Sequence, residues 1–416
     1  MNLIIEDFFE FKELLSQHSL FIIGLLLVFG YFLGKLADKV KLPEITGYII
    51  SGLLMGDAVF QMIPHDSELT IVTDVALALI ALTIGGEFSL SKLKVMGREV
   101  MILTIFQILL TYAVVSISLV IFKLELPFAL LMGAIATATA PAATVAIVQS
   151  LRAHGRFIDR LYGIVAMDDA GAVIVFSVSF AIATGMLSPR EAASGHGASL
   201  LIFHAFTEIV FSLLLGALFG FFIHKSTRKH TNTGEILILT LALVLLETAL
   251  ALFFHLSPLL SNMAAGAVLI NISPRNHRIF RTLEPLSPPV YALFFIIAGT
   301  ELNPSALMKK EILLLGAVFI VSRAIAKYSG INLGARAAGS AHNIRKYLGF
   351  CMLPQAGVAI GLVLMIQTSP VILALPEAEQ ATISLMVNIV LLSVFFNELT
   401  GPPLSKFAII HAMEEE

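Results

Sequence analysis

The stretch Tyr162-Gly-Ile-Val-Ala-Met-Asp168-Asp169-Ala-Gly-Ala-Val-Ile-Val-Phe176 is an apolar run that carries two adjacent carboxylates. It belongs to a segment long enough for a helix that crosses a bilayer. A carboxylate in the hydrocarbon core costs several kcal/mol unless it is paired or hydrated, and two neighbouring carboxylates also oppose each other's ionisation. The alternative is that one of the two aspartates lies near a helix end and only reaches the headgroups. The apolar residues on both sides favour a functional role.

The composition is that of a polytopic membrane protein. Of the 416 residues, 57% are hydrophobic and only 13% are charged, and the mean hydropathy is +0.92. Soluble domains are far more polar. The single cysteine, Cys351, excludes an internal disulfide and a cysteine metal cluster. The residues before the first apolar run are mostly acidic, which is the wrong sign for a signal peptide, so we expect that run to be a retained helix.

Apolar stretches of membrane-spanning length predict an all-α polytopic fold with about thirteen transmembrane helices. Of the 26 Lys and Arg residues, 19 fall in loops on one side of this arrangement and five on the other, and Arg323 and Lys327 fall inside a helix. The positive-inside rule then predicts a multi-pass protein of the cell (inner) membrane, with its N-terminus outside and its C-terminus in the cytoplasm. The predicted spans are 20–38, 44–62, 70–87, 100–122, 128–150, 161–185, 200–223, 235–255, 257–272, 285–300, 311–332, 347–367 and 378–396.

An odd number of spans permits an inverted repeat, in which the first six and the last six helices correspond and the seventh is a spacer. The second-to-last helix of each proposed repeat contains a break, at Thr139-Ala-Pro141 and at Pro354-Gln355-Ala-Gly357. A proline frees a backbone carbonyl, which in lipid must find another partner such as an ion. One such break could be an ordinary kink in a packed helix. Two breaks at matching places favour a site built on discontinuous helices.

The aspartates and the breaks are expected at one depth. Counted from the cytoplasmic ends at about 1.5 Å per residue, both aspartates and both prolines lie about 10–14 Å deep. Arg323 and Lys327 are four residues apart, so they share a helix face from which one of them can neutralise an aspartate. Alternatively, Lys327 extends to the interface. Arg323 stays charged at any working pH, so we expect it to be only a structural partner.

The two aspartates are expected to have different roles, and the other polar groups carry weaker signals. Adjacent helical residues point about 100° apart, so one aspartate is expected to face the ion pathway and the other the basic helix. No metalloprotease, phosphate-binding-loop or nucleophile-elbow motif occurs, which disfavours an enzyme. No cofactor is expected beyond the transported ions. We interpret several further intramembrane polar residues as interfacial or packing groups: Glu87, Glu208, Glu247 and Asn388.

In this order, these features resemble the cation:proton antiporter superfamily, and most closely its second branch of sodium/proton and potassium/proton exchangers. The resemblance spans nearly all of the chain and implies one sodium/hydrogen exchanger transmembrane domain over residues 1–416. It also implies a homodimer with a dimerisation part (about 20–87 and 235–300), a core ion-translocation part (about 100–185 and 311–396) and a linker helix (about 200–223). Further segments that carry it are Lys41-Leu-Pro43-Glu-Ile-Thr-Gly47-Tyr48, Gly85-Gly-Glu87-Phe-Ser-Leu and Phe294-Phe-Ile-Ile-Ala-Gly299-Thr-Glu301-Leu.

By position, the resemblance implies that Asp169 is the shared carboxylate that carries cation or proton. It implies that Asp168 is the extra carboxylate of electrogenic members and that Lys327 is its salt-bridge partner, although Arg323 is a second candidate for that pairing. No nucleotide-binding domain, such as some potassium-exchanging relatives carry, is present in this chain.

One departure from the family concerns the first helix break. Ala140 stands where first-branch exchangers have an aspartate after the threonine. This leaves Thr139 and backbone carbonyls as candidate cation ligands. Hard oxygen ligands suit a small monovalent cation, but they do not separate Na⁺ from K⁺ or Li⁺.

The sequence therefore predicts a secondary antiporter that exchanges cytoplasmic Na⁺ for external H⁺, electrogenically and by alternating access. Its expected partners are the lipid bilayer, the two transported ions and a second copy of the chain, with no nucleic acid. The alternative within transport is potassium/proton exchange. The alternatives of another class are a gated cation channel and an ion sensor that does not transport.

Overall fold

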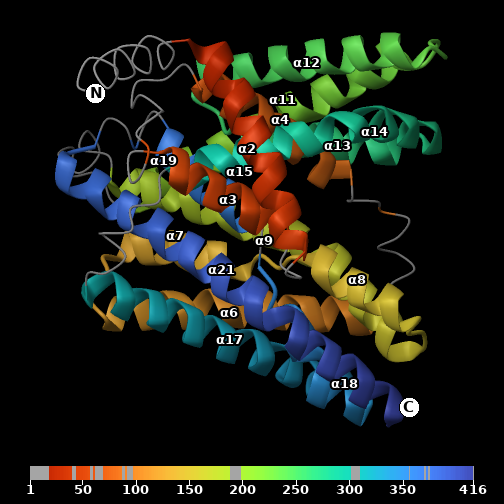
Figure 1. The fold of residues 1–416 in the computed structure, drawn as a ribbon, viewed down its shortest axis with the longest axis vertical. Helices are drawn as coiled ribbons and strands as arrows, with labels where there is room; N and C mark the ends of the chain where they lie inside the picture. The colour runs from red at the N-terminus through yellow and green to blue at the C-terminus, as the bar shows by residue number, and fades with distance from the viewer. Residues whose placement is uncertain are drawn as a thin grey trace, which may run out of the picture.

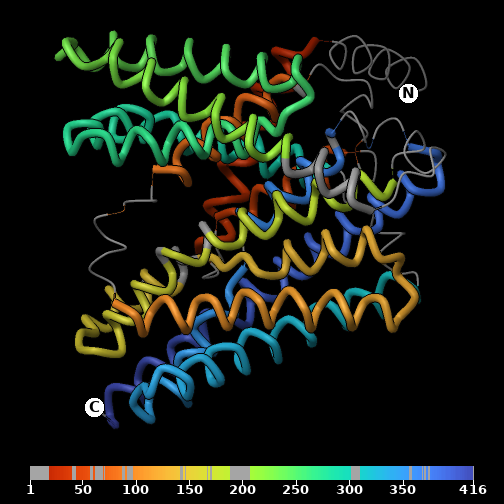
Figure 2. Tube along the Cα trace, turned by 180° about the vertical axis from the view of Figure 1, so that it is seen from behind, coloured from red at the N-terminus to blue at the C-terminus, as the bar shows by residue number. Residues whose placement is uncertain are grey.

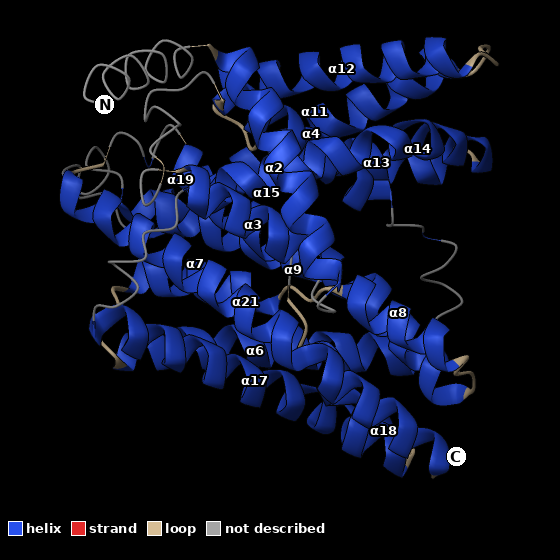
Figure 3. Cartoon of the chain, in the orientation of Figure 1, coloured by secondary structure: helices blue, strands red, loops and turns tan. Residues whose placement is uncertain are grey.

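The structure is a computed structural model that describes most of the chain. The described residues are 18–39, 44–56, 60, 69–86, 90, 97–187, 198–300, 310–355, 357–369, 372 and 375–415. Inside these ranges the side chains of several helical residues, Asp169 among them, are not described. Parts of the family-like segments lie outside the described residues: 41–43, 87–89 and 301–302. Every regular element in the described part is a helix (Figure 3), as the composition predicts.

The helices form two groups, one above the other in Figure 1, and the helices of each group pack mainly with one another. The view from behind shows the same division (Figure 2). The first group contains α2 (Ser19–Lys39), α3 (Glu44–Met55), α4 (Thr70–Gly86), α11 (Ala198–Thr227), α12 (Thr233–Phe253), α13 (Pro258–Ile272), η1 (Pro274–Asn276), α14 (His277–Leu283), η2 (Glu284–Leu286) and α15 (Ser287–Thr300).

The second group holds both helix breaks and the aspartate pair. Its members are α6 (Gly97–Ile121), α7 (Leu126–Thr137), α8 (Pro141–Leu151), α9 (Arg156–Leu187), α17 (Lys310–Ala338), α18 (His342–Tyr347), η3 (Leu348–Met352), α19 (Gly357–Thr368) and α21 (Glu377–Glu414). Of these, α9 also packs against α11, and α19 contacts α4 and α15, so these two helices lie at the boundary between the groups.

Seven of the described helical segments are long and apolar enough to cross a membrane. Large apolar side chains are exposed on their outer faces, such as Ile121, Ile238 and Ile325, as lipid-facing surfaces require. The chain is therefore a multi-pass membrane protein, while the count of thirteen spans stays a prediction. The last helix contains the predicted span 378–396 and continues beyond it to Glu414, although the apolar pattern weakens there.

The long helices α17 and α6 run side by side at the bottom of Figure 1. Their contact depends on small residues. A Cβ atom at Gly330 of α17 would lie 2.6 Å from the Cα of Gln107 in α6, which is closer than two carbon atoms can approach. Glycine therefore lets the two backbones touch, as is common between membrane helices.

The loops that follow α8 and α11 lie with the end of α21 on the right of Figure 1, whereas the α6–α7 loop and the start of α21 lie on the left. These two ends of the molecule are expected to face opposite sides of the membrane.

The predicted orientation can be tested by cysteine labelling. In a Cys351→Ala background, cysteines at the exposed positions Glu125 and Glu377 should react with an impermeant thiol reagent added outside cells. Cysteines at the exposed positions Ser226 and Arg275 should react only after the membrane is opened. The reverse pattern would show that the orientation is wrong.

Candidate functional site

The first helix break separates α7 from α8. Ala138 (φ −63°, ψ 141°) and Ala140 (φ −94°, ψ 106°) are extended, and α8 begins at Pro141. Proline disfavours the helical conformation in the residue before it and is well suited to the first turn of the next helix. Most of the last carbonyls of α7 therefore lack the backbone donors that a continuing helix would supply.

The second break lies between η3 and α19, at Leu353, Pro354 and Gln355. The amide N–H of Ala140 donates to the carbonyl of Pro354 over 2.9 Å, so the two interrupted segments meet here. We call this place the crossing, defined by residues 138–140 and 353–355. Gly357, predicted as part of this break, is the first residue of α19.

Arg323 of α17 connects the two breaks. Its guanidinium donates to the carbonyls of Ala136 (2.9 Å) and Ala138 (2.8 Å) at the first break and of Leu353 (2.7 Å) at the second. The side chain is fully buried. A positive charge at the C-terminal end of α7 is also favoured by the dipole of that helix. Arg323 therefore supplies donors that both interrupted backbones lack.

Lys327 lies one turn further along α17 and is fully buried. Its Nζ donates to the carbonyl of Thr137, to Oγ1 of Thr139 at 2.7 Å and to Oδ2 of Asp168 at 3.2 Å. The ammonium group thus lies among a carbonyl, a hydroxyl and a carboxylate oxygen. Of the two basic residues, it is Lys327 that forms the ion pair with Asp168.

Gln107 of α6 holds the other oxygen of Asp168: its Nε2 donates to Asp168 Oδ1. Its own Oε1 has no partner among the described residues. Gln107 is not predicted as a site residue from the sequence, because a single amide in an apolar run resembles a packing residue. An uncharged polar residue in the middle of a membrane span was the available signal.

Gln355 ties the crossing to α21. Its Nε2 donates to the carbonyl of Ile135 at 3.2 Å, and its Oε1 accepts from Ser393 Oγ and Asn397 Nδ2, both at 3.1 Å. The four last carbonyls of α7, residues 134–137, thus accept from the side chains of Thr137, Gln355, Arg323 and Lys327, respectively. The break is fully capped by side chains.

The structure brings together Asp168, Thr139, Lys327 and Arg323, but it does not describe the side chain of Asp169. Asp169 follows Asp168 in α9, and its assignment as the cation- and proton-carrying residue stays a prediction.

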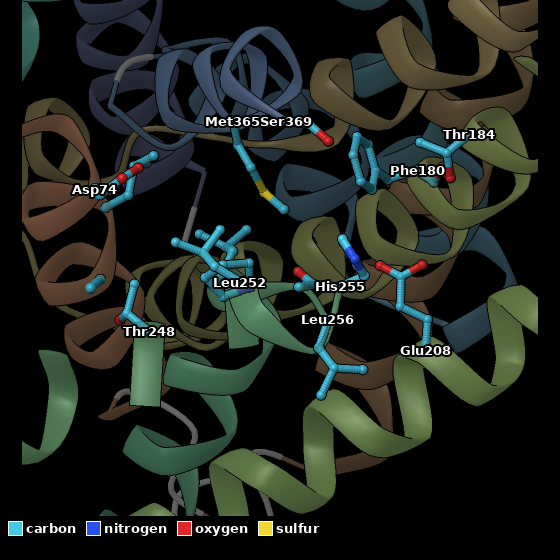
Figure 4. A pocket seen from close by; sticks show the side chains of 15 residues that line it. Asp74, Phe180, Thr184, Glu208, Thr248, Leu252, His255, Leu256, Met365 and Ser369 are labelled. Carbon is cyan, nitrogen blue, oxygen red and sulfur yellow. Dashed lines mark hydrogen bonds between the residues drawn. The ribbon is translucent and has the colours of Figure 1, made fainter. Parts of the chain in front are cut away.

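A cavity of about 110 Å³ lies between the two helix groups (Figure 4). It is lined by ends of helices that the sequence analysis assigns to the outer side of the membrane. Asp74 of α4 and Glu208 of α11 face it from opposite sides, and His255 and Met365 also line it. Glu208, interpreted from the sequence as a packing group, therefore borders open space between the groups.

Comparison with known proteins places these observations in context. Residues 24–406 match the family model described as the transmembrane sodium/hydrogen exchanger. The ammonium/H⁺ antiporter subunit AmhT of Alkalihalophilus pseudofirmus is 23% identical over 68% of this chain and 71% of its own length. The Na⁺/H⁺ antiporter 1 of Methanocaldococcus jannaschii is 26% identical over 81% of this chain and 80% of its own length.

A solved structure has the same fold. The sodium proton antiporter MjNhaP1 from Methanocaldococcus jannaschii, determined at pH 8, superposes with a TM-score of 0.74. The match covers 96% of this chain and 99% of that chain at 20% sequence identity.

The hydrogen bonds of Arg323 predict a stability effect. Arg323→Met keeps much of the side-chain length but leaves three buried carbonyls without donors, at a cost of about 1–3 kcal/mol each. We expect a clearly lower unfolding temperature in detergent, measured by tryptophan-independent methods such as thiol-dye or light-scattering assays. Arg336→Met, at an exposed position of the same helix, is the matched control. Equal unfolding temperatures for both variants would contradict the bridging role.

Proposed function

Because this chain belongs to the sodium/hydrogen exchanger family, we propose that it exchanges cytoplasmic Na⁺ for external H⁺ and moves net charge in each cycle. At the coarser level, the chain is a membrane-embedded cation/proton antiporter. The observation that carries the proposal is the position of the Lys327 ammonium group among oxygens of Thr137, Thr139 and Asp168.

These oxygens are the kind that a small hard cation prefers. A carbonyl, a hydroxyl and a carboxylate, together with the neighbouring Asp169 carboxylate, offer a cation most of a coordination shell. Lys327 now holds three of the oxygens, so a cation that binds there competes with its ammonium group. Binding of the cation and release of the Asp168–Lys327 pair are therefore coupled.

The coupling supplies a route for protons. Once its pair with Asp168 is broken, Lys327 is an ammonium group in buried surroundings, where burial disfavours the charged form, and it releases a proton. Asp169 releases a second proton when the cation takes its carboxylate. On the opposite side of the membrane, proton binding restores the pair and expels the cation. Two protons then move against one cation, which carries net charge across the membrane.

Alternating access fits the division of the helices. We assign the group with the crossing to the core ion-translocation part, α11 to the linker helix, and the rest of the other group to the dimerisation part (Figure 1). We propose that the core moves against a dimerisation part fixed in a homodimer. The cavity between the groups, with Asp74 and Glu208 on its walls, would widen and close during this motion.

Potassium is the alternative cation. The oxygens around Lys327 accept either ion, and one relative is named for ammonium, a monovalent cation close to K⁺ in size.

Everted membrane vesicles with a pH-sensitive dye should show proton movement on addition of NaCl, and a smaller response or none with KCl. A larger response to KCl would assign the chain to potassium/proton exchange, and no cation-dependent proton movement would favour a channel or a sensor.

The role of Asp169 predicts loss of exchange in a single variant. Asp169→Asn should abolish cation-dependent proton movement while the protein still inserts in the membrane. Asp159→Asn, at an exposed position of the same helix, should exchange as the wild type does. In the wild type, the apparent KM for Na⁺ should rise as the pH falls, because cation and proton compete for one carboxylate. Near-normal exchange by Asp169→Asn would show that the site is assigned to the wrong residue.

The role of the Asp168–Lys327 pair predicts a response to voltage. In proteoliposomes, a potassium–valinomycin potential should drive Na⁺ uptake by the wild type, and Lys327→Gln should lose that response. Lys310→Gln, at an exposed position of the same helix, should keep it. If wild-type transport ignores the potential and Lys327→Gln only lowers thermal stability, the pair is structural and exchange is electroneutral.

A further inference from the structure

Glu398 is a buried carboxylate that the exchange cycle described above does not use. It lies in α21, is only 6% exposed, and its Oε1 accepts no hydrogen bond from the described residues. An ionisable residue in the middle of a membrane helix indicates a function. Glu398 falls just beyond the last span that the sequence predicts, so the sequence analysis did not consider it.

The turn of α21 that carries Glu398 packs against the crossing. The preceding residue, Asn397, donates to Gln355. Three residues after Glu398, a Cβ atom at Gly401 would lie 2.8–3.0 Å from atoms of Pro354. Pro402 has no N–H, so the backbone carbonyl of Glu398 also loses its usual helical donor. Glu398 is therefore level with the two helix breaks.

Arg323 is the basic residue bound to the segment against which the turn of Glu398 packs. Its guanidinium donates to the carbonyl of Leu353, directly before the Pro354 and Gln355 that α21 contacts. Asp168 is already paired with Lys327, and the three hydrogen bonds of Arg323 go to uncharged carbonyls. Glu398 thus remains to balance the charge of Arg323. The described structure gives no direct ion pair between the two, so their interaction acts over a longer distance than a contact.

The other elements around this turn contribute no competing charge. The helices α7, α8 and α19 contain no ionisable residue, and η3 contains only the buried thiol of Cys351. The basic residues of α18 lie at the far end of α21, where Lys346 pairs with Glu415. On α9 the described charge at the crossing is Asp168, and on α17 the charges there are Arg323 and Lys327.

We propose that Glu398 is the counter-charge of Arg323 and thereby sets the affinity of the crossing for its cation. Arg323 cannot lose its proton at a working pH. Without a counter-charge, its positive charge would repel a cation bound among Thr139 and the aspartates. With Glu398 ionised, the two pairs Arg323–Glu398 and Lys327–Asp168 are each neutral. The inference rests on the proposed function only in that the crossing binds a cation.

The test compares two substitutions of Glu398 with a matched control. Glu398→Gln removes the charge and keeps the shape, and Glu398→Asp keeps the charge. Glu247→Gln is the control, because Glu247 is equally buried in α12, has an unpartnered oxygen and belongs to the other helix group. Each variant is reconstituted, and the KM and kcat for Na⁺-dependent proton movement are measured at alkaline pH.

Glu398→Gln should raise the KM for Na⁺ about tenfold, the size expected for one uncompensated charge at a distance of about 10 Å. The kcat should change less than about twofold, since weaker binding of the ground state alone raises KM. Glu398→Asp and Glu247→Gln should stay within about threefold of the wild-type KM. An unchanged KM for Glu398→Gln would overturn the proposal. So would a failure of Glu398→Gln to fold when Glu247→Gln folds, because Glu398 would then serve stability.

A second measurement separates this inference from the proposed function. The Na⁺ concentration that half-maximally stabilises the detergent-solubilised protein against heat reports binding without transport. If the wild type binds Na⁺ but moves no protons, the exchange function fails. A tenfold higher half-maximal Na⁺ concentration for Glu398→Gln would still support the role of Glu398 as a counter-charge. Equal half-maximal concentrations for the wild type and Glu398→Gln would overturn that role.

Discussion

Three hydrogen bonds from one guanidinium hold the centre of this protein together. Two helices are interrupted inside the membrane, and each interruption leaves backbone carbonyls that lipid cannot satisfy. Arg323 donates to carbonyls of both, and the direct bond from Ala140 to Pro354 joins the two segments where they meet. Broken helices are therefore tolerated at this depth because a residue that is always charged satisfies them.

Once Arg323 occupies the carbonyls, the remaining groups divide the work by charge. Lys327 donates to the carbonyl of Thr137, the hydroxyl of Thr139 and the carboxylate of Asp168, oxygens that a cation could also use. The same helix face therefore carries, one turn apart, a guanidinium that stays charged (Arg323) and an ammonium group that can lose its proton (Lys327). The two residues thus have different partners: backbone carbonyls of both breaks for Arg323, and the Asp168 carboxylate for Lys327.

Much of this arrangement follows from sequence patterns with a clear physical basis. Apolar runs of membrane length locate the helices, and Pro141 and Pro354 locate the breaks. The four-residue spacing of Arg323 and Lys327 predicts their shared face. The choice between these two residues could not be predicted, because the carbonyls that engage Arg323 belong to residues whose side chains carry no signal. Gln107 and Glu398 were missed for related reasons: their partners lie far away in the chain, and only the fold brings them to the crossing.

The length of α21 has a mechanical consequence. Its 38 residues extend for about 57 Å, nearly twice the thickness of a hydrocarbon core of about 30 Å. The helix is therefore longer than one straight span needs, and its middle contacts the crossing through Gln355. A displacement of α21 would reach the interrupted helices through this contact, without passing through any loop.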